Sequence, residues 1–291
     1  MICRGPQTAD RCILPGPPFF AAPGPCGKGG SAVIDENAVR ERLAALPGRI
    51  GFYCKNLVTG ETLSCGADTP MMAASVIKLF VLAEAERRMD EGTLDRDALF
   101  TVRHAECVPS CGALNYMHDG LQVTIGDLCT LMIIHSDNSA TNFLIDLLGF
   151  DAINALIRSL GYSVTALNRK MFDLESSARG IQNYICAAEV GDLLERMYRG
   201  TLVSPAASAD MLRIMRDQQI NHKIPFYLSE LPDPPEIAHK TGEDDGITHD
   251  AGIVYADEPF VVVFCGNETD VPAFARAIGE LSLELYRGNA K

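Results

Sequence analysis

The chain has 291 residues, of which 47% are hydrophobic and 22% charged, so it is long enough to bury a large core. Its formal net charge is −13, with acidic and basic residues interspersed, which argues against nucleic acid or an anionic membrane as a partner. We therefore expect a small molecule or a peptide-like amide or ester as the substrate. We also expect the chain to be a monomer.

Residues 1–30 contain most of a cluster of proline and glycine and no periodic apolar pattern, which predicts a disordered leader. This segment lacks the basic stretch, apolar core and cleavage site of a signal peptide. No window of the chain approaches the ~20 apolar residues of a membrane span. The expected location is cytoplasmic, and the alternative is an exported protein whose natural start or signal is missing.

The chain has ten cysteines, which form no CxxC pair and no His-rich pattern, so we expect neither a metal nor another cofactor. Cys129, Cys186 and Cys265 lie within apolar runs and should be small buried hydrophobic residues.

The first predicted elements are a helix and a strand pair. The stretch "AVIDENAVRERLAAL" has helical spacing of apolar residues, with Asp35 available as its N-cap. The stretch "RIGFYCKNLVTGETLSCG" alternates apolar and polar residues on both sides of a turn at Gly60, which is typical of a β-hairpin.

The middle of the chain, residues 73–199, is mainly helical in its periodicity. A further helix follows at residues 204–218. Strand patterns return in "EIAHKTGE", "HDAGIVYA" and "PFVVVFCGN", and residues 271–286 should form a final helix. These patterns predict an α/β fold in which an antiparallel sheet, flanked by helices, is built from both chain ends around an inserted all-α subdomain.

Ser75 and Lys78 form an S-x-x-K motif in the apolar stretch "MMAASVIKLFVLAE". Residues three apart share one face of a helix, so the hydroxyl and the amine should lie close together. Burial lowers the pKa of a lysine and makes it a plausible proton acceptor for a neighbouring serine. A single S-x-x-K is a weak signal, since a surface lysine beside a capping serine has the same spacing.

Two more polar motifs lie downstream. Ser136, Asp137 and Asn138 separate two helical runs, which is also the pattern of a loop followed by a helix cap. Lys240, Thr241 and Gly242 lie in a strand pattern, where a glycine can allow close approach of a ligand.

The order S-x-x-K, S-D-N and K-T-G is the signature of class A β-lactamases and penicillin-binding proteins. From about Ala32 to Leu285 the sequence resembles this superfamily of serine hydrolases. The resemblance implies a β-lactamase/transpeptidase-like fold for a catalytic domain at residues 31–291. Its α/β part would comprise residues 31–72 and 200–291, and its all-α part residues 73–199.

The resemblance also implies roles. Ser75 would be the nucleophile that forms an acyl-enzyme, and Lys78 its base or proton relay. Ser136 would pass a proton to the leaving nitrogen, while Lys240 supplies positive potential.

The remaining roles concern substrate binding. Asn138 would bind the substrate amide, and Thr241 with Lys240 a substrate carboxylate. The backbone N–H groups of Ser75 and Glu243 would form the oxyanion hole, with Gly242 next to it.

The sequence departs from the class A pattern at two places. Alignment on Arg169 puts Met171 where the water-activating glutamate is expected, and a thioether cannot deprotonate water. Asp173 or Glu175 could substitute, although Asp173 is better explained by pairing with Arg169 or capping a turn.

At the second place Ala251 replaces an arginine, and His249 is a possible substitute for carboxylate recognition, or a loop histidine without a role.

The expected function is therefore that of a class A β-lactamase-like serine hydrolase with slow deacylation. Two alternatives remain open. One is a D-Ala-D-Ala peptidase, amidase or esterase on the same scaffold, and the other is a non-turnover β-lactam-binding protein.

Overall fold

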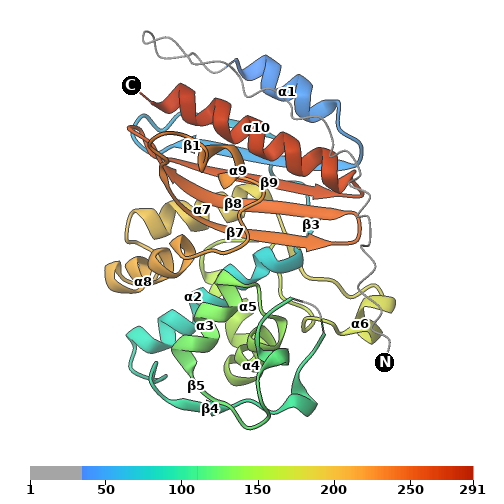
Figure 1. The fold of residues 1–291 in the computed structure, drawn as a ribbon, viewed down its shortest axis with the longest axis vertical. Coiled ribbons are helices and arrows are strands. Elements are labelled where there is room, and N and C mark those ends of the chain that lie inside the picture. Colours follow the sequence, from blue (N-terminus) through green and yellow to red (C-terminus); the bar gives the residue numbers. More distant parts are fainter. Residues whose placement is uncertain (1–34, 110, 291) are drawn as a thin grey trace, which may run out of the picture. The chain divides into compact units, whose positions relative to one another are not determined.

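The computed structural model describes residues 35–109 and 111–290, and the expected leader at residues 1–30 lies outside them. These described residues belong to one compact unit. The predicted fold class is confirmed: an antiparallel sheet is flanked by helices, and a group of helices is inserted between the sheet strands of the two chain ends (Figure 1).

The main sheet of the described chain has five strands in the order β2-β1-β9-β8-β7, all antiparallel. They are β1 (Arg49–Asn56), β2 (Thr62–Cys65), β7 (Glu236–Asp244), β8 (Ile247–Tyr255) and β9 (Phe260–Asn267). The hairpin of β1 and β2 turns at Gly60, whose φ of 81° suits glycine. Two short pairs lie elsewhere, β3 (Met71–Met72) with β6 (Tyr184–Ile185) and β4 (Leu99–Thr101) with β5 (Gln122–Thr124).

One face of the sheet is covered by α1 (Glu36–Ala44), α9 (Pro225–Leu228) and α10 (Val271–Asn289) (Figure 1). Asp35 caps α1 as predicted, because its side chain accepts hydrogen bonds from two backbone N–H groups. The large apolar side chains of this face include Phe52, Phe264 and Phe274, all fully buried. They form a core separate from the one on the opposite face.

The opposite face packs against the helical half of the molecule. Its elements are η1 (Ala74–Ile77), α2 (Lys78–Asp90), η2 (His104–Glu106), η3 (Leu114–Tyr116), α3 (Ile125–Ile134), α4 (Asn138–Leu148), α5 (Phe150–Ser159), α6 (Leu174–Ala178), α7 (Ala187–Tyr198) and α8 (Pro205–Arg216). The helix α2 is buried along most of its length because it lies at the centre of this half. The pocket described below opens where this half meets β7.

The expected boundary between the α/β part and the all-α part does not match the way the helices pack. Residues 73–199 were expected to be all-α, yet α7 lies directly against β1 and β9. Its apolar face carries Val190 and Leu194, which belong to the core beneath the sheet. The sheet-bearing part therefore includes α7, and the inserted part ends before it.

Among the described residues, no single helix is long and apolar enough to cross a membrane. The pair α4 and α5 passes such a test only jointly and is bent by 85°. The cysteines at 129, 186 and 265 are buried, as predicted.

Candidate active site

Ser75 lies in η1, directly before α2, and lines a pocket of 540 Å³. The preceding residue, Ala74, has a φ of 40°, a left-handed backbone conformation that alanine rarely adopts. Among the described residues no hydrogen-bond partner of the Ser75 hydroxyl is found. The strained turn therefore places Ser75 in the wall of this pocket.

Lys78, the first residue of α2, is completely buried and directed at the S-D-N motif. Its Nζ donates to Ser136 O at 2.7 Å, to Ser136 Oγ at 3.0 Å and to Asn138 Oδ1 at 2.7 Å. Burial and the nearby Lys240 charge lower the pKa of Lys78 well below its ordinary value. Its amine is therefore suited to take up a proton.

Lys240 approaches the same serine from β7. Its buried Nζ donates to Ser136 Oγ at 3.1 Å and to Thr241 O at 2.8 Å. Burial lowers the pKa of Lys240 to about 7. The Ser136 hydroxyl thus lies between two lysines from different halves of the fold and can relay a proton between them.

The other two members of these motifs hold the site together. Asp137 is buried, caps α4 through Ala140 N at 2.9 Å, and accepts from Ala113 N and Leu114 N at 2.7 and 2.9 Å. Gly242 packs against η1: a Cβ built on it would lie 3.2 Å from Ser75 N. Gly242 therefore allows the protein's own backbone, rather than a ligand's, to approach β7 closely.

Glu243 follows the K-T-G motif and lines the pocket together with Ser75 and Asn138. Thr241 is buried beside them. The structure therefore brings Ser75, Lys78, Ser136, Asn138 and the residues of the K-T-G strand into one site.

Met171 lines the same pocket and is only 9% exposed. Asn142 holds its backbone on both sides, accepting from Met171 N at 2.8 Å and donating to Met171 O at 3.0 Å. Sequence reasoning missed Asn142, although it lies four residues after Asn138 and so on the same face of α4.

The two carboxylates considered as substitute bases are placed elsewhere. Asp173 caps α6 by accepting from Ser176 N at 2.9 Å, which lowers its pKa. Glu175 is highly exposed and lies 3.6 Å from Arg179. Neither lines the pocket, while Arg169 bonds to Gln182 rather than to Asp173.

For His249 the sequence leaves open a substitute for carboxylate recognition or a loop histidine without a role, and the structure contradicts the loop placement. His249 lies in β8, is fully buried, and uses both ring nitrogens: Nε2 contacts Met72 O at 2.8 Å, and Nδ1 accepts from Gly266 N at 3.1 Å. Burial lowers the pKa of His249 to about 4. A neutral ring with both nitrogens occupied fastens β8 to β3 and cannot attract an anion.

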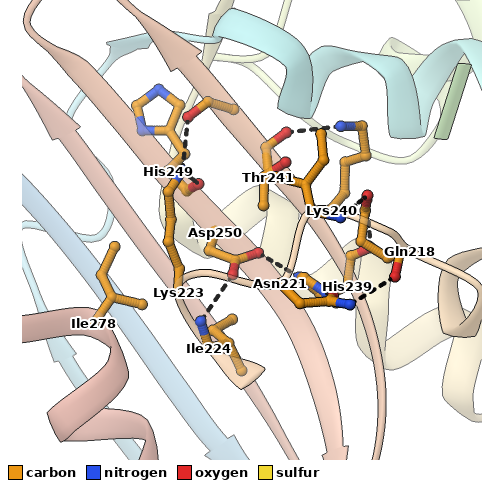
Figure 2. A network of polar contacts seen from close by, with 12 residues as sticks. Gln218, Asn221, Lys223, Ile224, His239, Lys240, Thr241, His249, Asp250 and Ile278 are labelled. Carbon is orange, nitrogen blue, oxygen red and sulfur yellow. Dashed lines mark hydrogen bonds and ion pairs between the residues drawn. The ribbon is translucent and has the colours of Figure 1, made fainter. Parts of the chain in front are cut away.

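A second buried network lies behind β7 (Figure 2). Asp250 Oδ1 contacts His239 Nδ1 at 2.9 Å, and His239 Nε2 contacts Asn221 Oδ1 at 2.9 Å. Asp250 also accepts from Ile224 N at 3.0 Å. These contacts tie the segment before α9 to β7 and β8, and the sequence offered no local pattern that would reveal them.

No group of three or more His, Cys, Asp or Glu side chains that could hold a metal ion is found within residues 35–109 and 111–290.

The match to a family model decides the family, because the model of the beta-lactamase enzyme family covers residues 36–288. The chain belongs to this family. A β-lactamase from Streptomyces fradiae is 28% identical over 261 residues, which cover 86% of this chain and 84% of that protein.

Two solved structures are also similar. A β-lactamase from Sphaerobacter thermophilus DSM 20745 superposes with a TM-score of 0.81 at 31% identity, covering 88% of this chain and 98% of that one. The structure of PBP-A gives a TM-score of 0.77 at 27% identity, covering 87% and 94%. The protein is thus a serine hydrolase of the β-lactamase type.

Proposed function

We propose that the protein is acylated at Ser75 by β-lactams or related amides and releases the acyl group slowly. The main support is the position of the Ser136 hydroxyl, which accepts hydrogen bonds from the buried lysines Lys78 and Lys240 behind the pocket that Ser75 lines. Such an arrangement supplies both a base and an acid to a serine nucleophile.

In the first step the Ser75 oxygen bonds to the carbonyl carbon of the amide while its proton passes toward Lys78. The N–H groups of Ser75 and Glu243 stabilise the oxyanion. The carbon–nitrogen bond then breaks, and the Ser136 hydroxyl delivers a proton to the leaving nitrogen. Asn138 orients the substrate amide, and Lys240 stabilises the charge that develops nearby.

The second step, hydrolysis of the acyl-enzyme, lacks its usual base in this proposal. Met171 lines the pocket where a carboxylate is expected by resemblance, and Asp173 and Glu175 lie away from it. A thioether cannot activate water. PBP-A, a relative of similar fold, has a variant solved as an acyl-enzyme complex with penicillin G.

The test mixes the protein with a chromogenic cephalosporin and follows product and intact mass together. We expect about one equivalent of rapid product and a mass adduct, because acylation outpaces release; Ser75→Ala should show neither. Absence of both adduct and turnover with every β-lactam tried would overturn the proposal. Rapid turnover without an adduct would contradict slow release.

Met171→Glu should speed loss of the adduct by at least about tenfold, because a positioned general base contributes roughly 10²–10⁴-fold. The matched control is Met171→Gln, which has a similar size but cannot take up a proton. Equal release rates in both variants would show that residue 171 does not lie where the hydrolytic water is activated.

A second candidate function is a D-Ala-D-Ala peptidase, an amidase or an esterase on the same scaffold. The observation in its favour is Met171, since a hydrolase of an easily released acyl group has less need of a dedicated carboxylate. Turnover of a peptide ending in D-Ala-D-Ala, or of a simple ester, in the presence of a stable β-lactam adduct would favour this candidate. An adduct with no turnover of any substrate would identify a β-lactam-binding protein.

A further inference from the structure

The segment from Arg169 to Asn183, which carries α6 (Figure 1) and lines part of the pocket, exposes large apolar side chains. Phe172, Leu174 and Ile181 are 39%, 71% and 38% exposed. Phe172 itself lines the pocket of Ser75. Exposed apolar side chains at a pocket are typical of a surface that binds an apolar ligand. The acylation steps proposed above use none of these side chains.

The polar side chains that this segment contributes to the pocket are bonded within the segment itself. Arg169 donates to Gln182 Oε1 from Nε at 3.0 Å and from Nη2 at 2.9 Å, and Gln182 Nε2 donates to Ser177 Oγ at 3.0 Å. Asn183 accepts from Arg169 N at 2.9 Å and donates to Arg169 O at 3.0 Å. Because a group that is already hydrogen-bonded gains little from a new partner, a ligand meets mainly the apolar side chains of this wall.

Phe172 is held in the pocket wall with a backbone conformation that phenylalanine rarely adopts. Its φ is 60°, in the left-handed region. Asn142 fixes the backbone of the preceding residue, Met171, on both sides, and Leu174 N donates to Phe172 O at 2.9 Å. Strain of this kind persists where surrounding contacts impose it, and it is common at functional sites. The fold therefore keeps an aromatic residue at this place.

The pocket has room and further apolar surface for a group bound to the reacting carbonyl. Its volume is 540 Å³, within the range of sites that hold drug-sized ligands. Ile247 on β8 and Val271 at the start of α10 also line it. Asp244 and Asp245 line it as well, so selection of a cationic group is the alternative that a test must separate.

We propose that Phe172 is a specificity-determining residue that selects acyl donors with an apolar acyl side chain, either aryl or alkyl. The inference rests on the proposed acylation of Ser75 and names the substrate class of that site: amides and esters whose acyl part carries such a group. While the carbonyl carbon bonds to Ser75, the apolar group packs against Phe172 and Met171 and leaves water. A donor without this group loses the contact and reacts more slowly.

The test compares benzylpenicillin with its 6-acetamido analogue, which lacks the phenyl ring. The second-order rate constant of acylation is measured for each by intact mass, and the ratio of benzylpenicillin to analogue is the readout, because an effect common to both compounds cancels. Phe172→Asn should lower this ratio about tenfold, as loss of an aromatic contact allows, and asparagine tolerates the left-handed conformation. Phe172→Leu keeps an apolar side chain and should leave the ratio within about threefold of its original value.

The matched control is Phe226→Asn, which removes a half-exposed ring from α9 on the other side of the sheet. Phe226 does not line the pocket, so this variant should leave the ratio within about twofold. An equal fall of the ratio in Phe226→Asn and Phe172→Asn would overturn the inference.

Two measurements on the unmodified protein do not depend on the folding of any variant. Lengthening the acyl chain of the penicillin from acetyl to butanoyl and hexanoyl should raise the rate constant at least about twofold for each added methylene, because each one buries more apolar surface. Ampicillin, which adds an ammonium group to the acyl part of benzylpenicillin, should react no faster than benzylpenicillin. A reaction about tenfold faster would show that Asp244 and Asp245 select the donor, and it would overturn the inference.

The outcomes distinguish the two proposals. If every compound forms an adduct but the ratio does not respond to Phe172→Asn, or the rate constants do not rise with chain length, the specificity inference is wrong and the acylation proposal stands. If no compound forms an adduct, the acylation proposal fails and the inference fails with it.

Discussion

Lys240 carries its charge in a place where burial opposes it. Its Nζ is removed from solvent, and its pKa is lowered to about 7, against an ordinary value of roughly 10.4 in an unfolded chain. Between these two values the unfolded chain binds more protons than the folded protein does. The contribution of Lys240 therefore makes the folded protein more stable as pH rises through this window, and less stable below it.

Lys240→Met should accordingly raise the free energy of unfolding at pH 7 by about 1–3 kcal/mol, after the loss of its hydrogen bonds is counted. The gain should shrink as pH approaches 10, and acylation of Ser75 should fall sharply. The change in the free energy of unfolding is measured by urea unfolding at several pH values, and acylation is measured by intact mass. Lys170→Met, at a partly exposed ion pair with Asp146, is the control for loss of a lysine charge at the surface. A less stable Lys240→Met at pH 7 would contradict the argument.

The spacing of the three motifs predicted correctly which of their residues lie close together. It pointed to Ser75, Lys78, Ser136 and Lys240, and the structure places both lysines within hydrogen-bonding distance of the Ser136 hydroxyl. It was a poor guide to His249, because no local pattern in a short polar stretch separates a loop histidine from one buried in a strand.

At the level of elements, the contact between η1 and β7 positions Ser75. Gly242 makes this contact possible, since an added Cβ would lie 3.1 Å from Val76 and from His249 as well as 3.2 Å from Ser75 N. A side chain there requires the Val76 and His249 side chains and the Ser75 backbone to give by a few tenths of an ångström, and we expect β7 to move away from η1. Such a movement would also change the distance from the Glu243 N–H to the Ser75 hydroxyl.

Gly242→Ala should lower the stability by about 1–3 kcal/mol and slow acylation by at least about tenfold. The matched control is Gly51→Ala in β1, where a Cβ would lie 3.2 Å from Gly66 O, with similar crowding but no contact with Ser75. Stability is measured by thermal unfolding and acylation by intact mass. An equal loss of acylation in both variants would show that only general destabilisation is at work.

Long elements were predictable because their apolar periodicity extends over several turns or strand residues. The helices α2, α3, α4 and α10 and the strands β7, β8 and β9 all lie where the patterns placed them. The short elements β3, β6 and α6 were not predicted, since two to five residues carry no readable period. The strained Ala74 turn depends on packing from β7 and likewise leaves no local signal.

At the scale of the molecule, one sheet separates two apolar cores. Phe274 belongs to the core under α10, and Leu193 to the core under α7. Both cores pack on strands β1, β7, β8 and β9 of the same sheet, so unfolding of one face exposes the apolar side chains of the other. We therefore expect residues 31–291 to unfold in a single transition.

Phe274→Ala and Leu193→Ala should each lower the urea midpoint, at a cost of about 3–5 and 2–5 kcal/mol respectively. In both variants the loss of circular dichroism and the loss of acylation at Ser75 should coincide. Persistence of acylation in Phe274→Ala after part of the secondary structure has melted would show that the two faces unfold independently.

The site draws on segments far apart in the sequence, with Ser75 on η1 and Lys240 on β7, a strand made late in the chain. A ribosome-bound chain that has emerged only as far as α5 carries the serine but has no K-T-G strand beside it, and it should be chemically silent. Covalent labelling by a β-lactam would then report completion of synthesis. Each labelled molecule is one whose final strands have emerged from the ribosome and joined β1.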